Sequence, residues 1–311
     1  MKNITIKGAG IEAPAIVTGV MRIQEKSDAE VRALFDASLE SGIDFFDHAD
    51  IYGAGTAHGC EARFAEALQL TAAQRSEITL QTKAGIVKDG PYFDFSHAHI
   101  IKAVEGSLQA LRTDYIDILL LHRPDALVEP EEVARAFDEL EAAGKVRAFG
   151  VSNHTPMQIE LLKRYVHQPL VANQVQLSIT HAPIVAQGVA MNMTGEAQSI
   201  SRDLGILDYC RLHDITIQAW SPFQAGFFNG VFLGNPDYPE VNAVIDRLAA
   251  EYGVPAEAIA TAWIVRHPAN MQVVLGTTSP DRVRAAALGA DVPLTRPQWY
   301  ELYRAAGHLV P

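Results

Sequence analysis

A single closed (β/α)8 barrel of the TIM type, preceded by a short N-terminal hairpin, is the α/β fold that this sequence predicts. Strand-like and helix-like segments alternate along the 311 residues. Several strand-like segments are nearly continuous apolar runs, as in parallel strands covered on both faces. Eight strand-then-helix units fit into this length, which favours a closed barrel over the runner-up, an open doubly wound sheet.

The predicted elements follow one another in a regular order. A polar opening that turns at Gly8 and Gly10 indicates a small hairpin. The barrel strands are then expected at 15–20, 43–49, 78–83, 116–122, 146–152, 171–178, 216–221 and 272–277. Because no repeat or Pro/Ser-rich linker interrupts the pattern, we predict one domain over residues 1–311.

Helix signals lie between these strands. The first helix opens with a capping box, in which Ser27 is followed by Glu30, and it ends at Gly42. Proline in the first turn favours a helix start. Further helices are expected at 99–111, at 130–143, from Pro156, after Ser279 and at 296–306.

Residues 182–203 do not follow the alternation of strands and helices. The stretch is long for a connection and contains glycine, methionine and small polar residues. Long ordered loops are often functional, so it could be a lid or a wall of the substrate pocket. An oligomer contact or a disordered insertion fits its composition equally well, and the oligomeric state stays open.

The composition excludes some partners. The chain has 37 acidic and 25 basic residues and a formal net charge of −12, which argues against nucleic acid as the main partner. No apolar run reaches the length of a membrane span, and the N-terminal residues lack the apolar core of a secretory signal. Cys60 and Cys210 have no metal-binding spacing, so we expect unpaired thiols in a reducing cytoplasm.

Four segments carry the chemistry, and each lies where a predicted strand ends. They are FFDHADIYG with Asp47 and Tyr52, LQTKAG with Lys83, ILLLHRPD with His122, and FGVSN. Strand ends and their following loops build the active site of a barrel, so these side chains should converge. A lysine beside a tyrosine lowers the pKa of the phenol, and an aspartate can neutralise that lysine.

A purely structural interpretation is also available for these residues. Asp47 and Lys83 could form a buried ion pair, and His122 could be a packed core residue. For any one residue this interpretation is the more common outcome. The combination on three different strand ends favours a device for proton transfer. The spacing of His48, Asp50 and His58 fits no closed metal site, so no metal is expected.

These motifs also resemble a known family. The motifs occur in the order found in the aldo-keto reductases, from Gly19 to the C-terminal helix; they are DHADIY, QTK, LLLHRPD and GVSN. The residues within the motifs are similar to those of the bacterial branch of that family. The resemblance implies an NAD(P)H-dependent oxidoreductase that reduces an aldehyde or ketone. Tyr52 would be the general acid, Lys83 would lower its pKa, Asp47 would pair with Lys83, and His122 would orient the carbonyl.

The same resemblance places the cofactor. Ser152, Asn153 and Gln174 would bind the nicotinamide carboxamide, Trp220 would stack on its ring, and Ser221 would begin the loop along the pyrophosphate. That loop, PFQAGFFNG, departs from the commoner glycine- and leucine-rich version. No GxGxxG strand–turn–helix motif is present, which suits a barrel.

The adenosine end of the cofactor would lie at the last strand. The residues expected to bind there are Gly276, Thr277, Thr278 and Arg282. Arg282 matches the family arginine that meets the 2′-phosphate, so NADPH is the expected cofactor and NADH remains possible. Gly276 and Ala286 stand where relatives carry a lysine and an asparagine, which weakens this preference.

Aromatic and apolar residues suggest the walls of the substrate pocket, which are expected to be Met21, Tyr92, Phe93, Phe95 and Phe223. They imply an apolar carbonyl compound of medium size. Two other functions are compatible with parts of the sequence. One is a Schiff-base aldolase or lyase that uses Lys83 as nucleophile, and the other is a redox-sensing partner protein that binds NADPH but turns over slowly.

Overall fold

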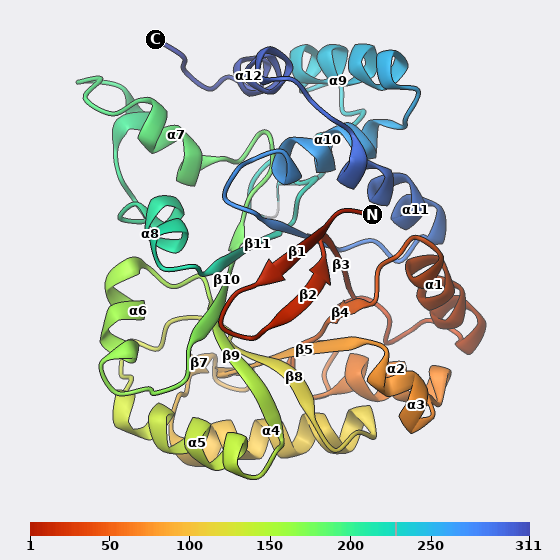
Figure 1. Cartoon of the computed structure of the whole chain (residues 1–311), viewed down its shortest axis with the longest axis vertical. Coiled ribbons are helices and arrows are strands. Elements are labelled where there is room, and N and C mark those ends of the chain that lie inside the picture. Colours follow the sequence, from red (N-terminus) through yellow and green to blue (C-terminus); the bar gives the residue numbers. More distant parts are fainter. Residues whose placement is uncertain (228) are drawn as a thin grey trace.

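A closed barrel of parallel strands forms the centre of the protein (Figure 1). The computed structural model describes residues 1–227 and 229–311. The strands are β3 (Ile16–Gly19), β4 (Phe45–Asp47), β5 (Thr79–Ala84), β8 (Ile116–Leu121), β9 (Val146–Ser152), β10 (Leu170–Gln176), β11 (Thr216–Trp220) and β12 (Gln272–Leu275). They pair in chain order, and β12 returns to pair with β3. The predicted barrel is therefore confirmed, and the open doubly wound sheet is wrong.

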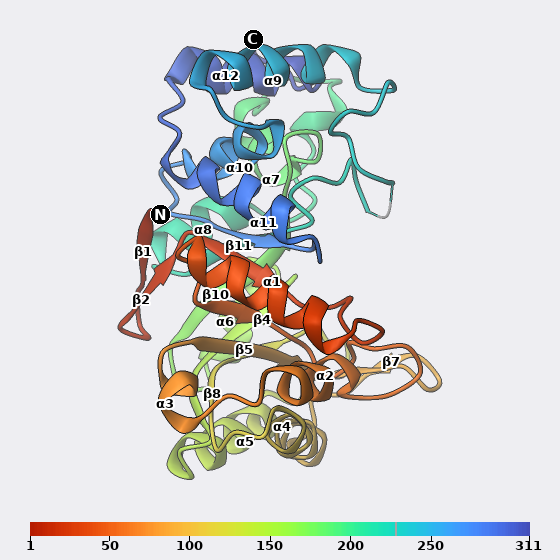
Figure 2. The ribbon, with the colours of Figure 1, turned by 90° about the vertical axis from the view of Figure 1, so that its right-hand side faces the viewer.

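Helices surround the barrel (Figures 1 and 2). They are α1 (Asp28–Glu40), α2 (Gly59–Leu68), α3 (Ala72–Ser76), α4 (His97–Leu111), α5 (Pro130–Ala142), α6 (Pro156–Lys163), α7 (Pro183–Val189), α8 (Ile206–Leu212), α9 (Pro239–Tyr252), α10 (Ala256–Val265), α11 (Pro280–Ala287) and α12 (Arg296–Ala305), with the 3-10 turns η1 (Ala197–Ser199) and η2 (Leu288–Asp291). The capping box predicted for α1 is present, since the Ser27 hydroxyl accepts from the Glu30 N–H and the Glu30 carboxylate accepts from the Ser27 N–H. Helix α4 begins two residues earlier than predicted because Ser96 caps it.

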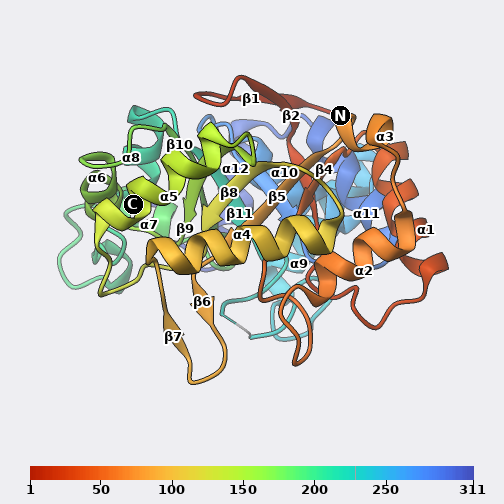
Figure 3. The same cartoon turned by 90° about the horizontal axis from the view of Figure 1, so that it is seen from below.

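Two hairpins lie at opposite sides of the barrel (Figure 2). The predicted N-terminal hairpin pairs β1 (Asn3–Ile6) with β2 (Ile11–Pro14). Its Ile6 is fully buried in one cluster with Phe45 and Ile118 from barrel strands, so the hairpin closes the N-terminal end of the barrel. The second hairpin, β6 (Ile86–Val87) with β7 (Tyr92–Phe93), projects from the other end (Figure 3). The C-terminal ends of the strands thus remain accessible.

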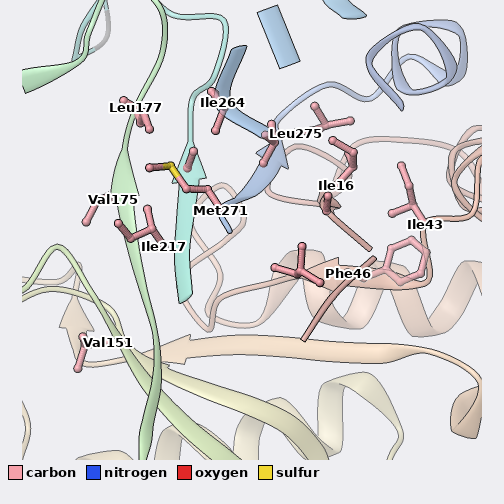
Figure 4. Packing of buried hydrophobic residues seen from close by; sticks show 14 of the residues in the cluster. Ile16, Ile43, Phe46, Val151, Val175, Leu177, Ile217, Ile264, Met271 and Leu275 are labelled. Atoms are coloured by element: carbon pink, nitrogen blue, oxygen red, sulfur yellow. The ribbon is translucent and has the colours of Figure 1, made fainter. Parts of the chain in front are cut away.

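The main core lies between the strands and the helices. Figure 4 shows part of it, with Ile16 and Ile217 of barrel strands in the same cluster as Ile264 of α10. Strands β8 and β9 are almost entirely buried, as the continuous apolar runs in the sequence predict. Burial of this apolar surface supplies the main driving force that holds the strand ends in place.

The segment 182–203 is ordered and contains helix α7, which the sequence pattern did not predict. Its side chains bond to the C-terminal part of the chain, because Gln198 donates to the Gly307 carbonyl and accepts from the Leu309 N–H. The segment also lines a groove of about 770 Å³ together with α8 and the start of α12. These contacts disfavour the alternative of a disordered insertion and join the segment to the tail that follows α12.

Two further findings concern the whole described chain. Cys60 and Cys210 are free, as predicted, and both are buried. Within residues 1–227 and 229–311, no helix combines the length and apolarity needed to cross a bilayer.

Candidate active site

The predicted catalytic side chains all start at the C-terminal ends of neighbouring strands. Asp47 is the last residue of β4, Lys83 lies one residue before the end of β5, and His122 directly follows β8. Because β4, β5 and β8 are consecutive in the barrel, their ends lie side by side. Tyr52 reaches the same place from the loop after β4, which is tied to β5 by a hydrogen bond from the Asp50 N–H to the Lys83 carbonyl (3.1 Å).

Lys83 is the centre of this arrangement. Its side chain is completely buried, and the ammonium donates to Asp47 Oδ2 (2.7 Å), the His48 carbonyl (2.7 Å) and the Tyr52 hydroxyl (3.3 Å). These contacts use all three donors of an ammonium group. Burial alone lowers the pKa of Lys83, but Asp47 and Tyr52 outweigh it and raise that pKa above the ordinary value. Lys83 is therefore a stable cation.

The phenol of Tyr52 is held in its protonated form. Withdrawal from water raises the pKa of Tyr52, and the charge of Lys83 opposes this rise without cancelling it. The predicted lowering of the pKa of Tyr52 by Lys83 is therefore present, but burial has the larger effect and the net shift of this pKa is upward. At neutral pH, Tyr52 has a proton to give.

His122 lies beside the phenol. The two rings meet edge to face with their centres 5.9 Å apart. Burial, followed by the charges of Lys83, Arg123 and Lys88, lowers the pKa of His122 well below its ordinary value. The imidazole is therefore neutral. Among the described residues, its buried Nδ1 has no hydrogen-bond partner.

A layer of glutamines beneath the site was not predicted. Gln81 and Gln174 both donate to Asp47 Oδ1 (2.6 and 3.1 Å), so both oxygens of the aspartate are bonded. Gln218 joins these amides and also donates to Gln272 (2.9 Å). Each glutamine comes from an otherwise apolar strand, and a buried amide is costly without partners. That cost is the signal by which the sequence could have revealed the layer.

The residues predicted to hold the nicotinamide lie together and are bonded to one another. The Ser152 hydroxyl donates to the Gln174 carbonyl (2.8 Å), and the Asn153 amide donates to Ser152 Oγ (2.8 Å). The Trp220 indole N–H donates to Asn153 Oδ1 (3.1 Å). This network fixes the orientation of the half-buried indole ring at the end of β11.

Backbone strain marks the same place. Asn153 (φ 60°) and Ser221 (φ 53°) adopt the left-handed conformation directly after β9 and β11. Non-glycine residues rarely do so, and such strain concentrates at functional sites. Residue 228, in the loop that follows Ser221, lies outside the described residues.

At the end of β12, the chain enters α11 through Gly276, Thr277 and Thr278. The exposed Arg282 lies in the first turn of α11, and among the described residues its side chain forms no ion pair. Arg22, which the sequence reasoning missed, donates to the Gly276 carbonyl (3.4 Å). The positive charge of Arg22 therefore lies beside the start of the loop that leads into α11.

The predicted substrate walls have different environments. Met21 and Phe93 are each 40% exposed, Phe93 on the projecting hairpin, and Phe223 is half-buried after β11. Phe95, in contrast, is buried beneath Gly85, where an added Cβ would meet its ring at 2.2 Å. The expectation that Phe95 lines the pocket is wrong, because its ring fills the core next to that glycine.

A second buried polar cluster lies behind the Tyr52 loop. Glu61, in the first turn of α2, accepts from Thr82 (2.5 Å) and Ser107 (3.1 Å) and contacts His58 Nδ1 (2.6 Å). Burial and the charge of Glu61 raise the pKa of the nearby Asp50 to about 7. Within the described part of the chain, no group of histidine, cysteine or acidic side chains could hold a metal ion.

Comparison with known proteins identifies the family of the chain. The sequence model of the Aldo/keto reductase family matches residues 15–305. The chain is 36% identical to the uncharacterized oxidoreductase YcsN of Bacillus subtilis and 37% identical to a 6-dehydroglucose reductase of Agrobacterium fabrum, each over 95% of both chains. Its fold is similar to that of a thermostable aldo-keto reductase, Tm1743 (TM-score 0.77, 21% identity, 98% of this chain and 100% of that one). The chain therefore belongs to the aldo/keto reductase family and is an NAD(P)H-dependent oxidoreductase that acts on small carbonyl compounds.

Proposed function

We propose that this protein is an NADPH-dependent reductase that converts an aldehyde or ketone into an alcohol, with Tyr52 as the general acid. Residues 1–311 would work as one domain. The two free, buried thiols suit a reducing cytoplasm.

One observation carries the proposal: the fully buried Lys83 ammonium is shared between Asp47 and the Tyr52 hydroxyl. Burial keeps the Tyr52 phenol protonated before the reaction, and the positive charge of Lys83 stabilises the phenolate that forms when the phenol gives up its proton. The cost of burying Lys83 is offset by Asp47, which is held in turn by the glutamine layer.

The roles of the side chains follow from their protonation states. A bound nicotinamide would supply the hydride that reduces the carbonyl carbon. Tyr52 gives its proton to the carbonyl oxygen, and the neutral His122 positions that oxygen. General acid catalysis of this kind contributes typically ~10²–10⁴-fold to the rate.

The residues present fit a nicotinamide cofactor. Trp220 offers a ring whose orientation Asn153 fixes, and the strained Asn153 and Ser221 shape the loops beside it. The first turn of α11 suits a phosphate, because Arg282 lies there and forms no ion pair with any residue that the structure describes. Arg22 can supply the positive charge that relatives obtain from a lysine at the position of Gly276.

The relatives also inform the substrate class. The 6-dehydroglucose reductases of Agrobacterium fabrum and of Novosphingobium aromaticivorans, 37% and 33% identical, have names that specify an oxidised sugar. This supports an oxygen-rich carbonyl substrate in place of the purely apolar compound that the aromatic residues suggest. Phe93 and Met21 are exposed, so the proposed substrate pocket is open to such a compound.

The Schiff-base alternative is not favoured by the geometry. Attack by lysine requires a neutral amine, whereas Asp47 and Tyr52 raise the pKa of Lys83 and its donors are already engaged. The redox-sensing alternative would show itself as tight NADPH binding without turnover.

The first experiment is titration of the protein with NADP⁺ and NAD⁺, followed by tryptophan fluorescence. Neither oxidised nucleotide absorbs tryptophan emission, so quenching reports direct stacking. The other two tryptophans, Trp263 and Trp299, stack on each other inside the outer helices, and Trp220→Phe should therefore remove most of the response. Saturable quenching followed by reduction of aldehydes with NADPH supports the proposal, whereas no binding in calorimetry overturns it.

A further inference from the structure

A positive charge that has no acidic partner among the described residues lies next to the proposed reaction centre. Arg123 directly follows His122 after β8 and is half-buried. Its guanidinium carbon is 5.8 Å from the centre of the Phe227 ring. Among the described residues, no carboxylate oxygen lies within 4.0 Å of this guanidinium and no hydrogen bond from it is found. The more deeply buried Arg75, in contrast, is paired with Asp117 (2.7 Å).

The nearest acid in the sequence is engaged elsewhere. Asp125 accepts from the Phe95 N–H (3.0 Å) and from the Leu127 N–H (2.8 Å), one with each carboxylate oxygen. It therefore holds the loop after β8 and is not placed to neutralise Arg123. Burial without a partner lowers the pKa of Arg123, which reflects the cost of removing an unpaired guanidinium from water.

A second cation increases the positive charge beside the proposed reaction centre. Lys88, in the turn between β6 and β7, donates to the Gly53 carbonyl (2.9 Å) and to no acid among the described residues. The charges of both Lys88 and Arg123 act on His122. The chain as a whole has a net charge of −12, so an anion would be repelled by most of its surface and attracted here.

We infer that Arg123 is a specificity-determining residue and that the substrate is a carbonyl compound that also bears a carboxylate. A planar guanidinium binds a carboxylate through two parallel hydrogen bonds. Such a contact holds the substrate by a group remote from the reacting carbon and so fixes the carbonyl against Tyr52. This inference rests on the proposed function, because it assigns the substrate class of the same site.

The test compares two aldehydes that differ only in charge, 4-carboxybenzaldehyde and its methyl ester. Wild-type protein should use the acid more efficiently, and Arg123→Gln should lower kcat/KM for the acid by ~10–100-fold, mainly through KM, with a change below ~3-fold for the ester. Arg123→Lys should restore part of the loss. Arg164→Gln removes an exposed arginine at the end of α6 and should leave both substrates unaffected.

Binding is measured separately from turnover. Calorimetry of the NADP⁺ complex with 4-(hydroxymethyl)benzoate should show binding to the wild type that Arg123→Gln loses, while NADP⁺ affinity is unchanged. Equal use of acid and ester, an equal loss of both in Arg123→Gln, or a loss of NADP⁺ affinity would overturn the inference. If the carboxylate binds through Arg123 but no aldehyde is reduced, the proposed function fails while the anion site stands.

Discussion

Gln174 Nε2 donates a hydrogen bond to Asp47 Oδ1 at 3.1 Å, which joins the predicted nicotinamide site to the buried ion pair. Asp47 holds Lys83 with its other oxygen, and Lys83 in turn donates to Tyr52. A residue expected beside the cofactor is thus two hydrogen bonds away from the ammonium that controls the phenol. Changes in either part should therefore be examined for effects on both cofactor binding and proton transfer.

Replacement of Tyr52 by phenylalanine should abolish carbonyl reduction. The change removes the proposed acid and leaves the ring, so kcat should fall by at least ~10²-fold while NADPH affinity stays within about twofold. Steady-state kinetics and calorimetry measure the two quantities. Tyr165→Phe, which removes the hydroxyl of a half-buried tyrosine that follows α6, is the control. Retention of a tenth or more of the wild-type rate in Tyr52→Phe would exclude Tyr52 as the acid.

Loss of Lys83 should destabilise the fold as well as stop the reaction. Lys83→Met leaves Asp47, which is 2% exposed, as an uncompensated buried charge, and we expect a loss of about 3–5 kcal/mol in the free energy of unfolding. The double variant Asp47→Asn with Lys83→Met removes both charges and should recover a large part of that stability without activity. Urea unfolding measures both. A double variant less stable than Lys83→Met alone would contradict this account of the pair.

Arg282 should discriminate between the two nicotinamide cofactors. Arg282→Ala should weaken NADPH binding by ~10–100-fold and NADH binding by less than ~2-fold, because only NADPH has the 2′-phosphate. Arg284, two residues later, is paired with Glu40 and Asp281, so Arg284→Ala is the matched control. Equal losses for both cofactors in Arg282→Ala would remove the 2′-phosphate assignment.

Asp50 should make stability depend on pH. Folding raises the pKa of Asp50 from its ordinary value near 4 to about 7. The stability that the protonated carboxyl group contributes is fully present below the ordinary pKa and is lost as the pH rises through the folded pKa. Asp50→Asn should therefore stabilise the protein by about 1–3 kcal/mol at pH 8 and by less at pH 5. Thermal unfolding at the two pH values measures the effect, with Asp36→Asn, an exposed position in α1, as control. A stabilisation of equal size at both pH values would show that the carboxyl group does not titrate as described.

The barrel strands and the helices α1, α4, α5, α6, α11 and α12 were predictable because their signals are local. Continuous apolar runs identify β8 and β9, and the capping box at Ser27 identifies the start of α1. Helix α7 was missed because it is short and has no side-chain cap, so its local signal is weak. Phe95 was misplaced for a related reason, since an aromatic residue in a loop has the same local pattern whether it faces a pocket or the core.

By itself, the sequence determined the barrel and the order in which Asp47, Tyr52, Lys83 and His122 come to neighbouring strand ends, because strand periodicity and chain order are properties of adjacent residues. Only the tertiary structure decided how these groups are charged. Three features depend on side chains brought together from distant parts of the chain. They are the full burial of Lys83, the glutamines that bond Asp47, and the lack of an acidic partner for Arg123 within the part of the chain that the structure describes. Protonation and pairing are set by distance and by exclusion of water, and both arise only when the barrel closes.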